Sequence, residues 1–272
     1  MSEEPWIPPS RDVQSSQSVP AGGKGLGSTA IAIIVVVVAA VVILGSVGAY
    51  LLFRELADDL DDFGFYKYTE PVAHELPAES YTAVEVSNVN GYVSIIGIDD
   101  TAIIYVDGLK RAHTEVDLDD FDLSITEDEG VLILEVIHED DNALNEAMDL
   151  DVVLPSDLLV LNAASVNGDV EVLGMDSVTD VRTTNGDLTV EVSSVDMDMS
   201  ISSTNGDIEV HILTSLDATI SMTTTNGVIS LNDVPMDLTE DESDYVSGTL
   251  NSGGYELEIE TANGNIDLRT LV

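Results

Sequence analysis

One short phrase recurs along the second half of this chain and limits what the chain can fold into. It is an Asn-Gly pair, and from Asn167 onward successive pairs are separated by 18, 20, 21 and then 37 residues. A period of about 20 residues is typical of repeat architectures, in which each repeat is one structural unit. The six copies are Asn90-Gly91, Asn167-Gly168, Asn185-Gly186, Asn205-Gly206, Asn226-Gly227 and Asn263-Gly264.

The residues around each pair alternate between apolar or small and polar. Alternation with a period of two indicates half-buried strands on both sides of the pair. Because Gly tolerates positive φ, we expect the chain to turn a corner there, and we interpret all six pairs as structural corners. Around Asn205 the alternating residues are Met199, Ile201 and Ser203 before the pair, and Ile208, Val210 and Ile212 after it.

Two folds fit this pattern. In a β-solenoid, the Asn side chains of successive coils point inward at a corner and stack into a ladder. In a meander of β-hairpins, each pair is a two-residue turn, and the hairpins form a sandwich or prism. The steady period favours the solenoid. We therefore predict an all-β, β-helix-like domain of about 20-residue repeats, with the hairpin meander as the alternative.

A long apolar stretch precedes the β pattern and indicates one transmembrane α-helix. No charged residue lies between Gly25 and Phe53, and about 20 apolar residues suffice to cross a bilayer. A short tail before this stretch and a large domain after it suit a cytoplasmic N-terminus and an extracellular β domain. The predicted organisation is a disordered tail (1–28), a transmembrane helix (29–53), a juxtamembrane linker (54–79) and a β-repeat domain (80–272).

The charge balance is strongly acidic. The formal net charge is −44, from 52 Asp and Glu against 8 Lys and Arg. This argues against nucleic-acid binding, which needs a basic footprint. Near 1 M salt the Debye length is about 3 Å, so repulsion between surface carboxylates is largely screened. We interpret the composition as that of a high-salt organism, a halophilic archaeon. Cys is absent, which excludes disulfides and thiol nucleophiles.

Three of the pairs are followed by Asp, at Asp169, Asp187 and Asp207. If coils stack about 4.8 Å apart, these side chains form an outward column. Carboxylate and carbonyl oxygens are the ligands that Ca²⁺ prefers, so the column is a candidate cation site, although its spacing alone closes no coordination shell. The stronger interpretation is a solvated row of charge. In that case Asp187→Asn should raise stability at low salt and change little at molar salt.

The order of several motifs resembles a known family. The motifs are Val86–Gly91, Gly108–Ala112, Leu150–Pro155 and the repeated Asn-Gly-Asp phrase. Together they are similar to the putative-adhesin family of β-strand-repeat proteins, a domain family of unknown function, over roughly residues 80–272. The resemblance implies a β-helix-like domain that is often membrane-tethered and has no catalytic residues. The rhythm weakens between Glu240 and Ser247, where we expect a surface insertion or an irregular coil.

Enzyme motifs are absent from the sequence. It contains no nucleophile elbow, phosphate loop or His-Glu-x-x-His segment, and His74, His113, His138 and His211 are scattered. We predict no catalytic residue and no cofactor. The favoured function is a membrane-anchored structural or adhesion module at the cell surface that contacts an unknown partner. The alternatives are an envelope sensor or accessory subunit with a cytoplasmic partner, and, ranked below it, a carbohydrate-active enzyme.

The C-terminal strand carries the last prediction. Residues 265–270 form the final strand of the pattern, and no capping segment follows them. Solenoids usually need a cap, and an uncapped strand edge is a template for pairing with another chain. We therefore expect an exposed edge at this strand and self-association into a homo-oligomer through it. Asp267 and Arg269 could blunt that edge.

Overall fold

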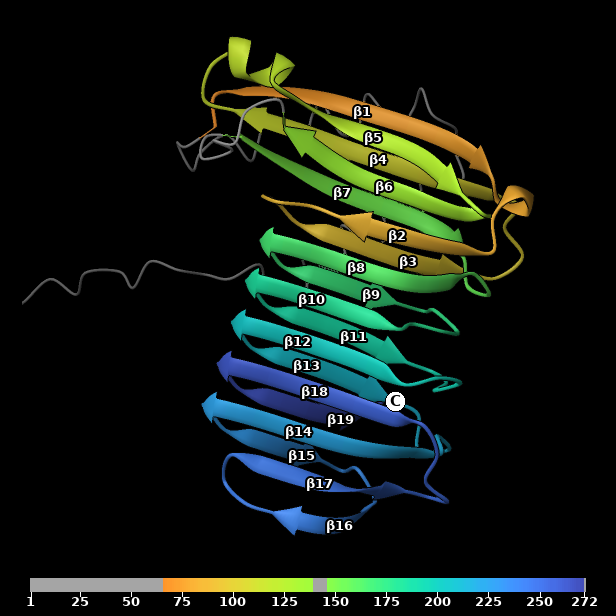
Figure 1. The fold of residues 1–272 in the computed structure, drawn as a ribbon, viewed down its shortest axis with the longest axis vertical. Helices are drawn as coiled ribbons and strands as arrows, with labels where there is room; N and C mark the ends of the chain where they lie inside the picture. The colour runs from red at the N-terminus through yellow and green to blue at the C-terminus, as the bar shows by residue number, and fades with distance from the viewer. Residues whose placement is uncertain (1–65, 139–145, 272) are drawn as a thin grey trace, which may run out of the picture. The chain divides into compact units, whose positions relative to one another are not determined.

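A computed structural model of the chain describes residues 66–138 and 146–271, and this part is all-β (Figure 1). Its strands form two mixed sheets. The helical segments of the described part are two short 3₁₀ turns, η2 (Ala78–Ser80) and η3 (Val116–Asp119), and none of its helices is long or apolar enough to cross a bilayer. The predicted tail (1–28) and transmembrane helix (29–53) lie outside the described residues.

The first sheet, sheet A, has nine strands in the spatial order β1-β4-β7-β3-β9-β11-β13-β19-β15. In chain order these strands are β1 (Tyr68–Pro77), β3 (Val93–Ile98), β4 (Ile103–Ala112), β7 (Glu146–Pro155), β9 (Val170–Leu173), β11 (Leu188–Val192), β13 (Ile208–Ile212), β15 (Ile229–Asn232) and β19 (Ile266–Thr270).

The second sheet, sheet B, has ten strands in the order β16-β17-β14-β18-β12-β10-β8-β2-β6-β5. In chain order these strands are β2 (Ala83–Ser87), β5 (Phe121–Asp128), β6 (Val131–His138), β8 (Leu159–Asn167), β10 (Asp180–Asn185), β12 (Met199–Asn205), β14 (Ala218–Asn226), β16 (Met236–Asp241), β17 (Tyr245–Leu250) and β18 (Glu256–Asn263).

Each repeat contributes one strand to each sheet and so makes one coil. β10 pairs with β8 and β12 in parallel, and Asn185 lies opposite both Asn167 and Asn205. On the other side of the corner, β11 pairs in parallel with β9 and β13. Strands joined by an Asn-Gly pair therefore lie in different sheets. This arrangement confirms the solenoid-like fold and excludes the hairpin meander.

The core lies between the two sheets, because alternate residues of every coil point inward. Val181 and Ile201 of sheet B and Val190 and Val210 of sheet A are fully buried. The coils stack along the solenoid (Figure 1). Paired strands place like residues over one another, so the apolar rows continue from coil to coil. A single coil buries little by itself, and its stability comes from its neighbours.

The N-terminal end of the described domain is antiparallel. β1 pairs with β4, β4 with β7, and β5 with β6, all antiparallel. β1 (Tyr68–Pro77) lies within the segment predicted as a juxtamembrane linker (54–79), so the linker prediction is wrong over these ten residues. Pro71 and Pro77 are compatible with this strand because β1 is an edge strand, where Pro need not donate to a ladder on both sides.

The C-terminal coil is not at the end of the solenoid. β18 lies between β12 and β14, and β19 lies between β13 and β15 (Figure 1). The prediction of an exposed edge at β19 is therefore wrong, and self-association through that edge loses its basis. The segment expected to be an insertion belongs to the hairpin β16–β17, which pairs antiparallel with β14 and covers that end of sheet B. Non-consecutive coils are adjacent, which sequence order could not reveal.

Candidate functional site

The Asn-Gly corners form a continuous ladder along the solenoid. From Asn167 onward, each Asn Nδ2 donates to the Oδ1 of the Asn in a neighbouring coil, at 2.7–2.9 Å. The spatial order of the ladder is Asn90, Asn167, Asn185, Asn205, Asn263 and Asn226. These side chains are exposed from Asn167 onward, so the expectation that they point inward is wrong. A ladder of amides on the surface satisfies donors and acceptors without a desolvation cost.

The residue two positions before each Asn from Asn167 onward points inward instead. It is a Ser or Thr, and its hydroxyl donates to the carbonyl oxygen of the corner Gly in the neighbouring coil, at 2.8–3.2 Å. Buried polar groups are tolerated where they are hydrogen-bonded, so these hydroxyls close the core at the corner. The buried residues are Ser165, Thr183, Ser203, Thr224 and Thr261.

The corner glycines are needed because of space rather than φ. A Cβ on Gly206 would lie 1.8 Å from the carbonyl oxygen of Gly186, and one on Gly264 would lie 1.9 Å from that of Gly206. Among the six corner glycines, Gly91 alone has a φ in the left-handed region, at 125°. The prediction that glycine supplies a positive φ at every corner is therefore wrong for the other five glycines. At those corners glycine is needed because the backbones of stacked coils approach too closely for any side chain.

The Asp column is also part of the corner. The Oδ1 of Asp169 accepts a hydrogen bond from the backbone N of Asp187, and the Oδ1 of Asp187 accepts one from the backbone N of Asp207, both at 2.8 Å. Asp207 accepts in the same way from Asn265, at 2.7 Å. One oxygen of each carboxylate is thereby engaged by the backbone. Within residues 66–138 and 146–271, no three His, Asp or Glu side chains are placed to hold a metal ion.

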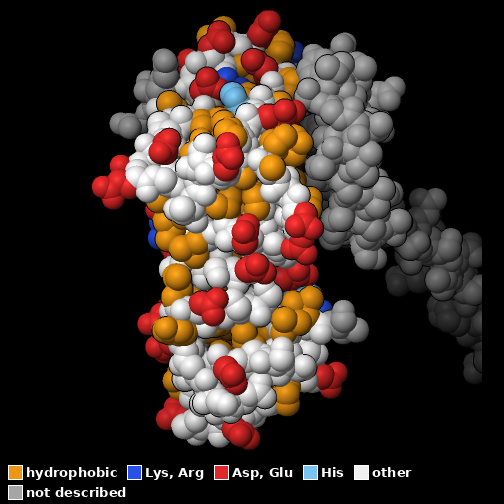
Figure 2. Space-filling model, turned by 90° about the vertical axis from the view of Figure 1, so that its right-hand side faces the viewer, with side chains coloured by type: hydrophobic (Ala, Val, Ile, Leu, Met, Phe, Trp, Pro, Cys, Tyr) orange, Lys and Arg blue, Asp and Glu red, His pale blue; other side chains and the backbone are white. Residues whose placement is uncertain are grey.

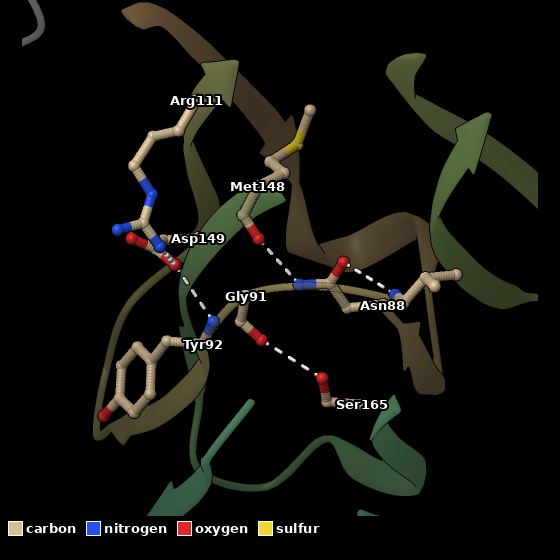
Figure 3. A network of polar contacts seen from close by, with 8 residues as sticks. Asn88, Gly91, Tyr92, Arg111, Met148, Asp149 and Ser165 are labelled. Carbon is tan, nitrogen blue, oxygen red and sulfur yellow. Dashed lines mark hydrogen bonds and ion pairs between the residues drawn. The ribbon is translucent and has the colours of Figure 1, made fainter. Parts of the chain in front are cut away.

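A polar network fastens the first corner to the antiparallel end (Figure 3). The buried Asn88 donates through Nδ2 to the carbonyl oxygen of Met148 at 2.6 Å. Asp149 takes the place of the Asp column here, since its Oδ1 accepts from the backbone N of Tyr92 at 3.0 Å. The same Oδ1 lies 2.5 Å from Nη2 of Arg111. These contacts tie β3, β4 and β7 together, and sequence reasoning missed all of them because their partners are 38 to 60 residues apart.

The outward face of sheet A is acidic. Asp107 on β4 lies directly opposite Asp151 on β7, and Glu171 on β9 lies in the same row beyond Ser94. Burial raises the pKa of Asp151 to about 7, with further contributions from Asp149, Asp107 and Glu171. Burial, followed by the charge of Glu75, also raises the pKa of Asp107. Like charges directly opposite on paired strands are destabilising, so this row holds its carboxylates at a cost.

Two groups relieve part of that repulsion. The hydroxyl of Tyr92 donates to Oε2 of Glu171 at 2.5 Å, and burial raises the Tyr92 pKa, so it stays a donor. Further along the row, Arg269 lies between Asp267 and Glu209, with N···O distances of 2.5 and 2.8 Å. Hydrogen bonding to Arg269 lowers the pKa of Asp267. Acidic side chains are also spread over the face drawn in Figure 2, with few Lys or Arg among them.

The outward face of sheet B differs. A groove of about 550 Å³ crosses β2, β8, β10, β12 and β18 close to the Asn corners. Small hydroxyl side chains dominate it, with Arg182 in its middle row and Glu260 on β18. Arg182 is 57% exposed and pairs with Asp180 of its own strand at 2.7 Å. The groove residues include Ser87, Val166, Thr184, Ser202, Thr204 and Ala262. Sequence reasoning missed this groove, although the outward positions of the repeat carry its residues.

The histidines do not come together. His138 Nδ1 lies 2.8 Å from Glu146 Oε2, and its ring stacks on Phe121 at 5.4 Å between centroids. His211 Nε2 lies 2.8 Å from Glu209 on the outward face of sheet A. Neither histidine lines the groove. The described geometry offers a surface for hydrogen bonding and charge contacts, and it brings no nucleophile–base pair to the groove.

Solved structures to which this chain is similar include two bacterial proteins. A putative cell adhesion protein from Clostridium sporogenes is 11% identical, with a TM-score of 0.56 over 75% of this chain and all of that one. A putative adhesin from Bacteroides fragilis is 9% identical, with a TM-score of 0.32 over 74% of this chain and 97% of that one. At this identity the first likeness shows the fold alone. No curated protein matches the chain.

The family itself follows from the sequence match. Residues 75–269 match the family described as Toastrack DUF4097. The match begins within β1 and ends within β19, so it includes the antiparallel end, the regular coils and the coil inserted between them. Since it spans well over half of the sequence, the chain belongs to the Toastrack DUF4097 family.

Proposed function

We propose that this chain is a non-catalytic adhesion module at the surface of a halophilic cell, held by one transmembrane helix at residues 29–53. The observation that carries the contact role is the groove of sheet B, a Ser- and Thr-rich surface in a chain of net charge −44. The groove offers aligned hydroxyls, one Arg and one Glu. Such a surface suits a polar partner that binds through hydrogen bonds and charge contacts. The description of the Clostridium sporogenes structure as a putative cell adhesion protein supports the same role.

The anchor and the environment rest on the sequence. The uncharged segment from Gly25 to Phe53 is long enough to span a bilayer. With that helix in the membrane, the short N-terminal tail lies in the cytoplasm and the β domain outside. The acidity of the sheet A face favours molar salt, where a Debye length of about 3 Å screens neighbouring carboxylates.

Surface labelling tests the topology. An epitope tag after Val272 should bind antibody on intact cells, with lysed cells as the control for total protein. Labelling only after lysis, with a known surface protein labelled in parallel, would contradict the proposal. Deleting residues 2–28 should leave cell attachment unchanged, because the tail takes no part in contact. Loss of a cellular response after this deletion would favour an envelope sensor instead.

A pair of matched substitutions tests the contact face. Ser202→Tyr fills the groove on β12, whereas Thr189→Tyr places the same ring on β11 of the opposite sheet; both positions are outward and half-buried. Attachment between cells that express the full chain should fall with Ser202→Tyr and stay unchanged with Thr189→Tyr. Equal attachment for both variants, at equal surface expression, would exclude the groove as the contact surface.

A further inference from the structure

The C-terminal coil occupies a slot between two coils that precede it in the chain. The slot is bounded by β12–β13 on one side and by β14–β15 on the other, and it is filled by β18–β19 (Figure 1). Chain order would instead stack β14–β15 directly on β12–β13, as it stacks β12–β13 on β10–β11. The last coil therefore enters between elements that are made before it.

The two walls of the slot are in register with each other. Within sheet B, Ile259 pairs with Ile201 on one side and with Met222 on the other, so Ile201 and Met222 share one apolar row. Within sheet A, Ile266 pairs with both Ile208 and Ile229. Removing the coil and closing the gap by one strand spacing would thus bring apolar residues over apolar residues on both sheets.

Each polar contact across the slot also has a replacement. Asn226 donates to Asn263, which donates to Asn205, so closure allows Asn226 to donate to Asn205. The Thr224 hydroxyl donates to the carbonyl oxygen of Gly264, and that of Thr261 to Gly206, so Thr224 can take the bond to Gly206.

The backbone hydrogen bonds at the corners also have replacement partners after closure. The backbone N of Val228 bonds to Asn265 Oδ1, and that of Asn265 to Asp207 Oδ1, so Val228 can bond to Asp207 instead. A glycine is present at each of the three corners, so the close backbone approach is preserved. The gap can therefore close without leaving an unpaired strand edge inside the solenoid.

We infer that the C-terminal coil is an exchangeable element. The slot closes by direct pairing of β12 with β14 and of β13 with β15 when the coil is out, and it accepts the same coil from a second copy of this chain. The hinge is the segment 251–255 before β18, which contains Gly253 at a φ of 70° and Gly254. Exchange of an identical element between copies across a hinge loop is domain swapping, and a second copy's coil makes the same contacts.

Cysteine pairs distinguish the two forms, since the chain contains no Cys. Glu260 pairs with Ser202 on β12 and with Thr223 on β14, and all three point outward. Ser202→Cys with Glu260→Cys reports the coil in place. Ser202→Cys with Thr223→Cys reports the closed slot, because two strand spacings, about 9.6 Å, exceed the roughly 7 Å that a disulfide spans. Ala164→Cys with Ser202→Cys, which flank Arg182 in the same way, is the matched control.

The full chain is unfolded in urea, refolded in detergent under oxidising conditions and separated on non-reducing gels. We expect the 202–223 bridge at least tenfold above the 164–202 control during refolding, with the 202–260 bridge dominant at the end. Equal yields of the 202–223 and 164–202 bridges would overturn the closed form. The 202–260 variant also reports that the cysteine-bearing chain folds.

Exchange between copies is measured with single-cysteine chains. Ser202→Cys and Glu260→Cys chains are mixed, refolded together and oxidised, and a mixture of Ala164→Cys and Glu260→Cys chains gives the background from collisions. The interchain 202–260 bridge should exceed that background and rise with protein concentration, and the unsubstituted chain should yield dimers on size-exclusion chromatography. A yield equal to background at every concentration, with the unsubstituted chain monomeric throughout, would overturn exchange.

Discussion

The two outer faces of this solenoid share one scaffold but differ in chemistry in the rows beside the Asn-Gly corners. In the sheet A row that contains Glu171, Thr189 and Glu209, carboxylates dominate. In the sheet B row that contains Ser202, the neighbours are Arg182 and Glu260, and the groove residues around them are small and hydroxylated. The inner residues of both sheets are the same apolar type. The fold is thus fixed by the inward positions, which leaves the outward positions free to differ in function.

The comparison also shows where charge is tolerated. Carboxylates of sheet A persist where a backbone N–H, a Tyr hydroxyl or Arg269 faces them. In the described part of the chain, no backbone N–H, Tyr hydroxyl or Arg donates a hydrogen bond to Asp151, and its pKa is raised. The sheet B row around Ser202 carries less repulsion between like charges at low salt, because Ser202 separates Glu260 from Arg182, which has the opposite charge. The substitutions below test that division, beginning with the corner that both faces share.

Gly206→Ala should have the largest effect, since it breaks the corner between the faces. The new Cβ would lie 1.8 Å from the carbonyl oxygen of Gly186, which is backbone and cannot rotate away. We expect a loss of about 4 kcal/mol or more in the free energy of unfolding, in the range reserved for severe packing defects. Urea unfolding of the full chain in detergent measures it. Thr204→Ala, an exposed neighbour, should change stability by less than about 0.5 kcal/mol, and an equal loss for both would contradict the close-approach explanation.

Asp151→Asn should stabilise the chain above pH 7 and have no effect near pH 3. The folded-state pKa of Asp151 is raised from 3.8 to about 7, so the native chain loses stability as pH rises from about 4 to 7, and the Asn variant does not. A shift of this size sets a ceiling of about 4 kcal/mol, and we expect about 2 because the side chain is partly exposed and shares its charge with neighbours.

Urea unfolding across this pH range provides the measurement for Asp151→Asn, and Asp267→Asn is the control with the opposite sign. Because hydrogen bonding to Arg269 lowers the pKa of Asp267, its contribution is present above the unfolded pKa and is lost as pH falls. Asp267→Asn should therefore destabilise at pH 7. A pH-independent effect of Asp151→Asn would argue against a raised pKa.

Asp187 separates the structural role of the column from its charge. Asp187→Ala removes the acceptor of the Asp207 N–H and should cost about 1–2 kcal/mol at any salt concentration. Asp187→Asn keeps an acceptor, as Asn265 does beyond Asp207 in the same column, and should stabilise the chain at low salt only. Unfolding at 0.1 M and 2 M KCl distinguishes the two. A loss with Asp187→Asn at both concentrations would point to a bound cation.

Thr189→Glu and Ser202→Glu should give the smallest effects and compare the faces directly. Thr189 lies between Glu171 and Glu209, so a carboxylate there should cost about 0.5–1 kcal/mol at low salt and less at 2 M KCl. Ser202 lies between Arg182 and Glu260, whose charges oppose each other, so Ser202→Glu should show little salt dependence. The difference between low and high salt is the measured quantity. Equal salt dependence at both sites would remove the electrostatic distinction between the faces.

The repeat predicted more of the local structure than of the order of its parts. The strands around each Asn-Gly pair, the corner and the amide ladder all follow from period-two alternation and a 20-residue spacing. The linker prediction failed at β1 because Tyr68–Pro77 contains two Pro residues, which in a sequence indicate an interruption of regular secondary structure. An edge strand accommodates both of them. The groove was missed because outward Ser and Thr residues are individually unremarkable and form a surface only when coils stack.

The sequence by itself determined that the repeat domain is all-β, that its coils turn at Asn-Gly, and that its surface is acidic. These properties depend on residues close in the chain or on composition. Only the tertiary structure decided two further properties. The corner glycines are required because the backbones of stacked coils approach closely, and the last coil lies inside the stack. The physical reason is that the coils are nearly equivalent in register, so local pattern fixes what each coil is. Which coil lies beside which is decided by pairing between segments up to 77 residues apart.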